Sequence, residues 1–302
     1  MNDYHERIQQ VIDYIEDHLD RPLSLSELAA VAGFSDFHFH RVFQFMVGDT
    51  VMDYVRKRKL AGAAYRVSHT KDRLLDIALD SGFGSQETFI RAFRKLFGIT
   101  PGMYRKRRVD TPTYPRASVR KQRLQPYLGG IQMDYRIEEK PAFHVLGYTM
   151  ATRNTDGQNM KEIPAFWVKY MTENWGKALN EATGNVNEYG LCCDFNMETG
   201  EFTYLIGVDA EESVAPPEGA VLRSFPVTTF AIFTTPKVPR EKFTDSIQAT
   251  WGQIYGEWFP HSDYEHSGAG FEFEYYDERC LGDENGLVQL DIYIPVMKRK
   301  AQ

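Results

Sequence analysis

The sequence has few of the features that mark secreted, membrane-spanning or metal-binding proteins. Only three of its 302 residues are cysteines. Cys192 and Cys193 are adjacent, so no C-x-x-C spacing offers a zinc site and no disulfide framework is indicated. No apolar run approaches the roughly 18 residues that span a bilayer, and the polar first residues, MNDYHERIQQ, do not resemble a signal peptide. These absences predict a cytoplasmic protein with no membrane partner, no metal and no cofactor.

Positive charge is also scarce over the chain as a whole, but it is unevenly divided. The net charge of -7 taken alone argues against a nucleic-acid partner. Residues 1–125, however, hold 21 Lys+Arg and 15 Asp+Glu, a balance of +6, and the remainder holds 14 and 27, a balance of -13. This asymmetry indicates a basic part that meets a polyanion and an acidic part with a different task.

The pattern of the chain predicts two domains, as its length allows. Residues 1–108 show helical periodicity with short breaks. Residues 109–126 hold three prolines and no clear period, which predicts a linker. Residues 127–302 alternate β-rich segments with two helical ones. We therefore expect an all-helical N-terminal domain followed by an α+β domain.

The N-terminal part contains an internal repeat in which each copy predicts a helix, a turn and a second helix. With a shift of 50 residues, Ser35 matches Ser85, Phe39 matches Phe89, Arg41 matches Arg91 and Gly48 matches Gly98. Upstream the shift is 49, because Gly84 is inserted into the second turn. Ser24 or Ser26 can cap the first helix, Gly33 ends it, and Ser35 and Ser85 cap the second helices. Residues 51–67 predict a longer helix between the copies.

The repeat suits DNA, because in a helix-turn-helix unit the first helix braces the second in the major groove. An isolated exposed arginine is usually only solvated, but Arg41 and Arg91 occupy the same register of two copies and can each pair with a guanine edge. The residues predicted to contact bases are Phe37, His40, Arg41, Gln44, Gln86, Glu87, Ile90 and Arg91. Those predicted to contact phosphates are Ser35, Lys57, Arg58, Ser85, Arg94, Lys95, Arg105 and Lys106.

Residues 8–108 resemble the DNA-binding domain of the AraC/XylS family of bacterial transcription regulators. The resemblance lies in LSLSELAAVAGFSDFHFHRVFQFMVG and LLDIALDSGFGSQETFIRAFRKLFGITPGMYRKRR. It implies a double helix-turn-helix domain whose recognition helices enter successive major grooves of promoter DNA. By motif position it also places Phe37, His40, Arg41, Gln86, Glu87 and Arg91 in the grooves. Glu87 departs from the neutral polar residue that is usual there, and an acidic side chain, although it can accept from cytosine, is repelled by phosphate.

The C-terminal part predicts two β-α-β-β units in one α+β domain. In the first, one long strand or a strand pair at 135–150 precedes a helix at 161–180 and strands at 188–195 and 202–210. In the second, a strand at 221–236 precedes a helix at 241–260 and strands at 271–278 and 287–296. This order, with its Trp-bearing helices, resembles the GyrI-like effector-binding domain, which implies a small and often cationic or aromatic effector.

The expected effector site centres on the stretch FEFEYYDE. The resemblance places the acidic residue of the ligand cleft at Glu274, followed by Tyr276. A carboxylate among aromatic faces suits an organic cation, although acidic strand residues are more often solvated and periodic aromatics more often fill a core. The remaining residues predicted to bind the ligand are Trp167, Tyr170, Trp251, Tyr255 and Trp258.

These features together predict a ligand-responsive, sequence-specific transcription regulator. We expect it to be an activator, with promoter DNA, a small-molecule effector and RNA polymerase as partners. Two alternatives stay open for the C-terminal domain. It can be a small-molecule hydrolase with Glu274 as general base, or a drug-sequestering module. The chain has no G-x-S-x-G or H-E-x-x-H motif, so we do not expect an enzyme, and sequestration alone leaves the basic repeat without a role.

Overall fold

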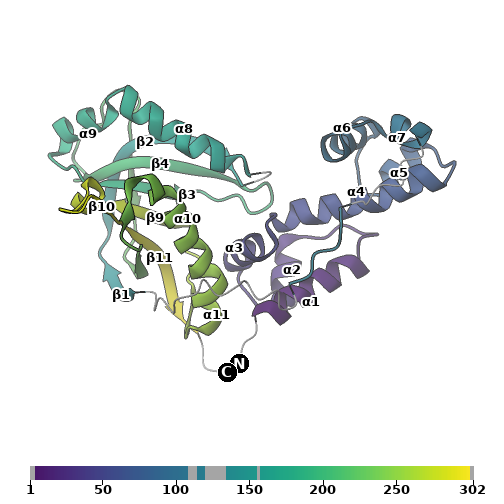
Figure 1. The fold of residues 1–302 in the computed structure, drawn as a ribbon, viewed down its shortest axis with the longest axis horizontal. Helices are drawn as coiled ribbons and strands as arrows, with labels where there is room; N and C mark the ends of the chain where they lie inside the picture. Colours follow the sequence, from purple (N-terminus) through teal and green to yellow (C-terminus); the bar gives the residue numbers. More distant parts are fainter. Residues whose placement is uncertain (1–3, 108–113, 120–133, 155–156, 300–302) are drawn as a thin grey trace. The chain divides into compact units, whose positions relative to one another are not determined.

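The computed structural model describes residues 4–107, 114–119, 134–154 and 157–299. The chain divides between residues 122 and 123 into two compact units, which are described separately. The first unit is helical and the second is α+β with a large antiparallel sheet (Figure 1). The predicted fold classes of both domains are therefore confirmed.

The first unit consists of two groups of three helices joined by one long helix. Figure 1 shows the long helix, α4, running from the first group to the second. The helices are α1 (Tyr4–Asp17), α2 (Leu25–Ala32), α3 (Asp36–Val47), α4 (Val51–His69), α5 (Leu74–Asp80), α6 (Gln86–Phe97) and α7 (Pro101–Arg107). The two helix-turn-helix units are α2–α3 and α5–α6.

Local capping chemistry explains where three of these helices begin. The side chain of Ser24 accepts a hydrogen bond from the backbone N–H of Glu27, so Ser24 rather than Ser26 caps α2. Ser35 caps α3 in the same way. Ser85 forms a reciprocal capping box with Thr88 at the start of α6. Each cap satisfies a backbone donor that the first helical turn leaves without a partner.

The two recognition helices bury equivalent aromatic pairs. In α3, the rings of Phe39 and Phe43 are 5.7 Å apart at 64°. In α6, the rings of Phe89 and Phe93 are 5.5 Å apart at 62°. All four side chains are fully buried. The repeat seen in the sequence is therefore repeated in the packing, and this fixes which face of each helix points outward.

Residues 114–119, which fall within the predicted linker, are attached to the first group of helices. The backbone N–H of Ala117 donates to the hydroxyl of Tyr54, and that of Val119 donates to Oε1 of Gln9, at 3.1 and 3.0 Å. The side chain of Arg116 pairs with Asp13. This part of the predicted linker is therefore a docked extension of the DNA-binding unit; residues 109–113 and 120–126 lie outside the described residues.

The second unit is built on one antiparallel sheet with the order β1-β6-β11-β9-β3-β4-β2-β5, to which β8 adds beside β11. The strands are β1 (Tyr135–Lys140), β2 (Phe143–Arg153), β3 (Glu188–Cys193), β4 (Glu201–Ala210), β5 (Val221–Phe225), β6 (Thr228–Thr234), β8 (Tyr264–His266), β9 (Phe271–Tyr276) and β11 (Asp291–Lys298). A separate pair joins β7 (Val238–Pro239) to β10 (Leu287–Val288). The helices are α8 (Asn159–Thr172), α9 (Trp175–Thr183), α10 (Phe243–Gln253) and α11 (Phe259–His261).

The two predicted β-α-β-β units are present and meet at the centre of the sheet. The first runs β2, α8–α9, β3, β4, and the second runs β6, α10–α11, β9, β11. The third element of each unit lies innermost, so that β3 pairs with β9 and Gly190 stands opposite Glu274. A residue at this junction is flanked by helices from both units.

Three predicted segments are interrupted in the structure. The helix expected over 161–180 breaks into α8 and α9 at Asn174, which has a left-handed φ of 54°, a conformation that asparagine tolerates better than most residues. The strand expected over 221–236 divides at Pro226, which has no N–H to give to a ladder. The helix expected over 241–260 contains a π-helical turn at Ile254–Trp258.

The sheet is curved, and its two faces are covered differently. One face forms a cluster made only of strand residues, in which the rings of Phe143 on β2 and Phe273 on β9 approach to 5.9 Å although two strands lie between them. On the other face, α8 and α9 cover β2 and β4. Glu274 lies on this second face, because it alternates with Phe273 along β9.

Candidate functional site

The outer face of α6 is polar and open to solvent. Gln86, Glu87 and Arg91 are exposed, and Ile90 is partly exposed. Farther along the helix, Arg94 and Lys95 are also exposed. A recognition helix needs such a face opposite its buried stripe. All six predicted contacts on this helix are therefore in positions from which they can reach DNA.

The equivalent face of α3 is less open. Arg41 and Gln44 are partly exposed, and the guanidinium carbon of Arg41 lies 5.3 Å from the ring centroid of Phe45. Phe37 and His40 are buried, with 5% and 2% of their surface exposed. Both side chains would have to become exposed before they could touch a base, whereas Arg41 is already partly exposed.

Two of the predicted phosphate contacts on α4 are engaged in interactions within the unit. Lys57 pairs with Asp49. Arg58 donates from Nε and Nη2 to the two carboxylate oxygens of Glu16, each at 2.7 Å, and also bonds the carbonyl of Tyr114. The Arg58 side chain is only 16% exposed. Its geometry indicates that it holds α1, α4 and the docked extension together.

Arg105 is also held by the protein, whereas its neighbour Lys106 is exposed. The Nε of Arg105 donates to the carbonyl of Val67 at 3.0 Å, and Nη2 donates to the carbonyl of Asp72 at 2.7 Å. These carbonyls flank the end of α4, where the last helical carbonyls have no intrahelical partner. Arg105 therefore joins α7 to the turn that leads into the second helix-turn-helix unit.

We expect Arg105→Ala to destabilise the DNA-binding unit by about 1–2 kcal/mol, because it leaves two backbone acceptors unpaired. The measurement is the denaturation midpoint followed by the helical circular dichroism signal. Lys106→Ala removes the same charge from an exposed position and is expected to leave the midpoint unchanged while weakening DNA binding. Equal midpoints for the two variants would show that the Arg105 contacts contribute nothing to stability.

The expected effector site is formed around Glu274. One carboxylate oxygen accepts from the indole Nε1 of Trp251 on α10 at 2.9 Å, and the other accepts from the hydroxyl of Tyr276 at 2.7 Å. Three of the predicted ligand residues, Glu274, Tyr276 and Trp251, are thus brought together. The side chains of all three keep partial exposure.

Burial controls the charge of Glu274. The surrounding protein raises the pKa of the carboxyl group above its ordinary value, the nearby Glu272 adds to the rise, and the hydrogen bonds from Trp251 and Tyr276 oppose it. The carboxylate is therefore costly to ionise, although the residue as a whole keeps partial exposure. A ligand that brings a positive charge would relieve this cost.

Opposite Glu274, Gly190 lets neighbouring side chains approach the backbone of β3 more closely than any larger residue would allow. A Cβ atom at Gly190 would lie 3.2 Å from Oε2 of Glu274, 3.3 Å from a ring carbon of Tyr276 and 2.4 Å from the hydroxyl of Tyr204. Tyr204 itself is buried and accepts from the Nε1 of Trp167 at 2.9 Å. Gly190 and Tyr204 were not predicted as site residues. The available signal was a glycine inside a strand, which often marks close approach of a ligand or backbone.

The other predicted ligand residues divide into two groups. Trp167 packs 4.9 Å from the ring of Tyr276 and 5.7 Å from that of Tyr170, so both reach the site from α8. Tyr255 instead donates to the buried carboxylate of Glu272 at 2.8 Å. Trp258 packs on Phe233 and Tyr135, with ring distances of 4.9 and 5.2 Å. The structure does not bring Tyr255 and Trp258 to Glu274.

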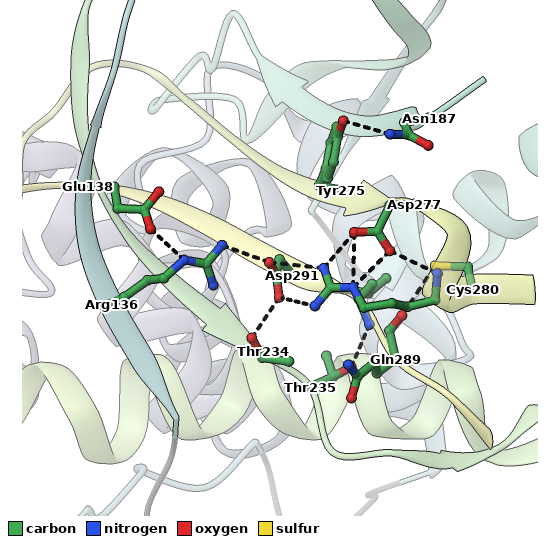
Figure 2. A network of polar contacts seen from close by, with 12 residues as sticks. Arg136, Glu138, Asn187, Thr234, Thr235, Tyr275, Asp277, Cys280, Gln289 and Asp291 are labelled. Carbon is green, nitrogen blue, oxygen red and sulfur yellow. Dashed lines mark hydrogen bonds and ion pairs between the residues drawn. The ribbon is translucent and has the colours of Figure 1, made fainter. Parts of the chain in front are cut away.

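A polar network fixes the end of β9 just beyond the site (Figure 2). Arg279 pairs with both Asp277 and Asp291, at 2.7 and 3.0 Å. Asp291 is 3% exposed and also accepts from Arg136 on β1 and Thr234 on β6. Asp291 stands opposite Tyr275, so the network lies on the face of the sheet away from Glu274. It anchors the strand without entering the site.

Two family models match the chain. The model described as integron-associated effector binding protein matches residues 136–296. The model described as helix-turn-helix domain matches residues 28–107. The chain belongs to the AraC family of helix-turn-helix regulators, and its C-terminal unit to the family of integron-associated effector binding proteins. Both resemblances predicted from the sequence are thereby confirmed.

Individual relatives match one unit or the other. The uncharacterised HTH-type regulator YbfP of Bacillus subtilis is 45% identical over 102 residues, which cover 34% of this chain and 35% of YbfP. The regulatory protein SoxS of Escherichia coli is 40% identical over 100 residues, which cover 33% of this chain and 94% of SoxS. A solved structure of SAV2435 bound to tetraphenylphosphonium covers 55% of this chain and 94% of its own, at 17% identity and a TM-score of 0.46. The chain thus spans only about a third of YbfP.

Two further properties concern the described residues alone. None of the helices in those ranges is long and apolar enough to cross a bilayer. Within the same ranges, no group of three or more His, Cys, Asp or Glu side chains is placed to hold a metal ion.

Proposed function

We propose that this protein is a ligand-responsive transcription regulator whose N-terminal unit reads promoter DNA and whose C-terminal unit binds an aromatic organic cation. The recognition helices are α3 and α6, and base contacts come chiefly from Arg41, Gln86 and Arg91. In this proposal the effector switches on transcription, so the protein is an activator that also contacts RNA polymerase.

The observation that carries the effector part is the setting of Glu274. The residue is partly exposed, and its carboxylate has a raised pKa and is bonded to the polar edges of two aromatic side chains, Trp251 and Tyr276. An aromatic cation gains Coulomb attraction from the carboxylate and cation–π attraction from the rings. Because the two bonds orient the carboxylate without neutralising it, binding rather than hydrolysis is the favoured role.

The test of the whole proposal is selection of genomic DNA fragments by the purified protein at ~150 mM salt, a physiological ionic strength. The selection is run with and without tetraphenylphosphonium, an aromatic cation with no hydrogen-bond donor. We expect one enriched motif with two half-sites about one helical turn apart, and an occupancy that changes with the cation. Equal retention of all fragments would refute sequence-specific recognition.

Two variants on α6 separate base contact from phosphate contact. Arg91→Ala should relax specificity at one position of the motif at a cost of about 1–3 kcal/mol. Arg94→Ala, which removes the same charge from the same helix, should weaken binding to all sequences and lower the salt dependence. Both effects are measured by titration against the motif and its single-base variants. If Arg91→Ala weakens every sequence equally, Arg91 does not read a base.

A further inference from the structure

We infer that the effector site holds a second carboxylate, Glu188, and is built for a ligand with two cationic ends on an aromatic centre. This inference rests on the proposed effector function and specifies its ligand class. The two carboxylates are Glu274 on β9 and Glu188 on β3.

Glu188 and Glu274 lie on the same face of neighbouring strands. In the ladder between β3 and β9, Glu188 is paired with Tyr276 and Gly190 with Glu274. Glu188 and Glu274 are therefore diagonal neighbours, whose side chains begin about 7–8 Å apart in an antiparallel pair. The residue that would stand between them on β3 is Gly190, which has no side chain. The space between the two acids is left to Tyr276.

Each carboxylate has the same kind of surroundings, a tyrosine hydroxyl and a glycine. Glu274 has Tyr276 and Gly190. Glu188 has Tyr170 and Gly176, since a Cβ atom at Gly176 would lie 3.2 Å from Oε1 of Glu188 and 3.0 Å from the hydroxyl of Tyr170. At both positions a residue larger than glycine would crowd the carboxylate.

The Tyr170 hydroxyl lies beside the Glu188 carboxylate. The side chain is 3% exposed, and its hydroxyl lowers the pKa of Glu188 against the rise that burial causes. Tyr170 therefore has the same relation to Glu188 that Tyr276 has to Glu274.

One indole lies between the two halves of the site. The ring of Trp167 contacts Tyr276 at 4.9 Å and Tyr170 at 5.7 Å, and its Nε1 is fixed by Tyr204. Its orientation is therefore set by the protein before any ligand arrives. A flat aromatic centre can pack on this ring while a cationic group at each end meets a carboxylate.

Electrostatics agree with this arrangement. Burial raises the pKa of Glu188, as it does that of Glu274. A single positive charge relieves only one of the two acids, whereas a dication relieves both. The negative charge of Glu272 adds to the rise at Glu274.

The test compares two ligands that differ by one ammonium group, p-xylylenediamine and 4-methylbenzylamine, measured calorimetrically on the full chain. We expect the diammonium ligand to bind at least about tenfold more tightly, the ratio that one charge-assisted contact gives. Glu188→Gln should reduce the ratio to about two, the statistical advantage of two equivalent ends, and lower the monoammonium affinity by at most about twofold, since that ligand can still meet Glu274. Tyr170→Phe should reduce the ratio in part, because it keeps the ring but removes the hydroxyl.

The controls separate this inference from the proposed function. Glu181→Gln removes an exposed charge from the neighbouring α9 and should leave the ratio at its wild-type value. A ratio unaffected by Glu188→Gln, or equal weakening of both ligands, overturns the dication inference while the effector site stands. If neither ligand binds, or if Glu274→Gln leaves both affinities unchanged, both the dication inference and the proposed effector site at Glu274 are wrong.

Discussion

Glu274→Gln is expected to weaken binding of aromatic cations strongly and to raise the melting temperature of the ligand-free protein at neutral pH. The amide keeps the shape of the side chain: its oxygen can accept from the indole of Trp251, and its N–H can donate to the hydroxyl of Tyr276, which turns to accept. It lacks the charge that burial penalises. We expect a gain of about 2–4 °C, the shift that 1 kcal/mol produces in a unit of this size.

The same variant gives a defined dependence on pH. Because the pKa of Glu274 is higher in the folded protein than in an unfolded chain, the folded state binds more protons between the two values. Stability therefore falls as pH rises through this window, and the penalty is complete above the folded pKa. The advantage of Glu274→Gln should accordingly shrink as pH falls from neutrality and vanish below the ordinary pKa of glutamate.

The expected effect of Glu274→Gln on ligand affinity is larger than its effect on stability. Removing one partner of a partly buried charge pair costs about 2–5 kcal/mol, so the affinity for tetraphenylphosphonium should fall at least about 30-fold. Quenching of tryptophan fluorescence measures it, since Trp167 and Trp251 border the site. Glu278→Gln, an exposed acid in the next turn of chain, is the control and should change neither property. A variant that binds normally and melts no higher would remove Glu274 from the site.

The parts of the fold that the sequence predicted well depend on local chemistry. The helix caps at Ser24, Ser35 and Ser85 and the buried pairs of the two recognition helices follow from residues within a few positions of one another. The alternation of Glu274 with Phe273 also follows from strand geometry alone. Local rules of this kind act whatever the rest of the chain does.

The parts that differed depend on distant contacts. Arg105 looks like a phosphate contact in a basic run, but it bonds the carbonyl of Val67, 38 residues away. Tyr255 stacks on Trp251, as helical spacing predicts, but its hydroxyl is taken by the buried Glu272. Trp258 ends the π-helical turn over Ile254–Trp258, which changes the helical register, and it packs on Phe233 instead. The sequence has no periodic pattern that marks which backbone carbonyls Arg105 bonds or where a helix contains a π-helical turn.

Gly190 shows most clearly what sequence reasoning misses, because its role lies in what is absent. The pattern EYGLCC predicts a buried strand, and the glycine within it carries no chemistry of its own. Only the pairing of β3 with β9 shows that this position faces Glu274. The site is thus defined as much by a missing side chain as by the groups around it.

Gly190→Ala adds only one methyl group, but we expect it to weaken ligand binding strongly. The new Cβ atom would lie 2.4 Å from the hydroxyl of Tyr204, which must move and release the indole of Trp167. Crowding of this kind costs about 1–3 kcal/mol of stability, and we expect at least a tenfold loss of affinity for tetraphenylphosphonium. Both quantities come from calorimetry and thermal melting of one preparation.

The matched control is Gly252→Ala on α10, where an added Cβ meets nothing within 4 Å. It should bind normally and melt slightly higher, because alanine favours a helix over glycine by about 0.5–1 kcal/mol. If Gly190→Ala also binds normally, the ligand does not use the space between β3 and the helices, and Glu274 and Glu188 would have to be reached separately. If it loses binding but keeps its stability, Tyr204 has adapted and the loss comes from occupation of the site itself.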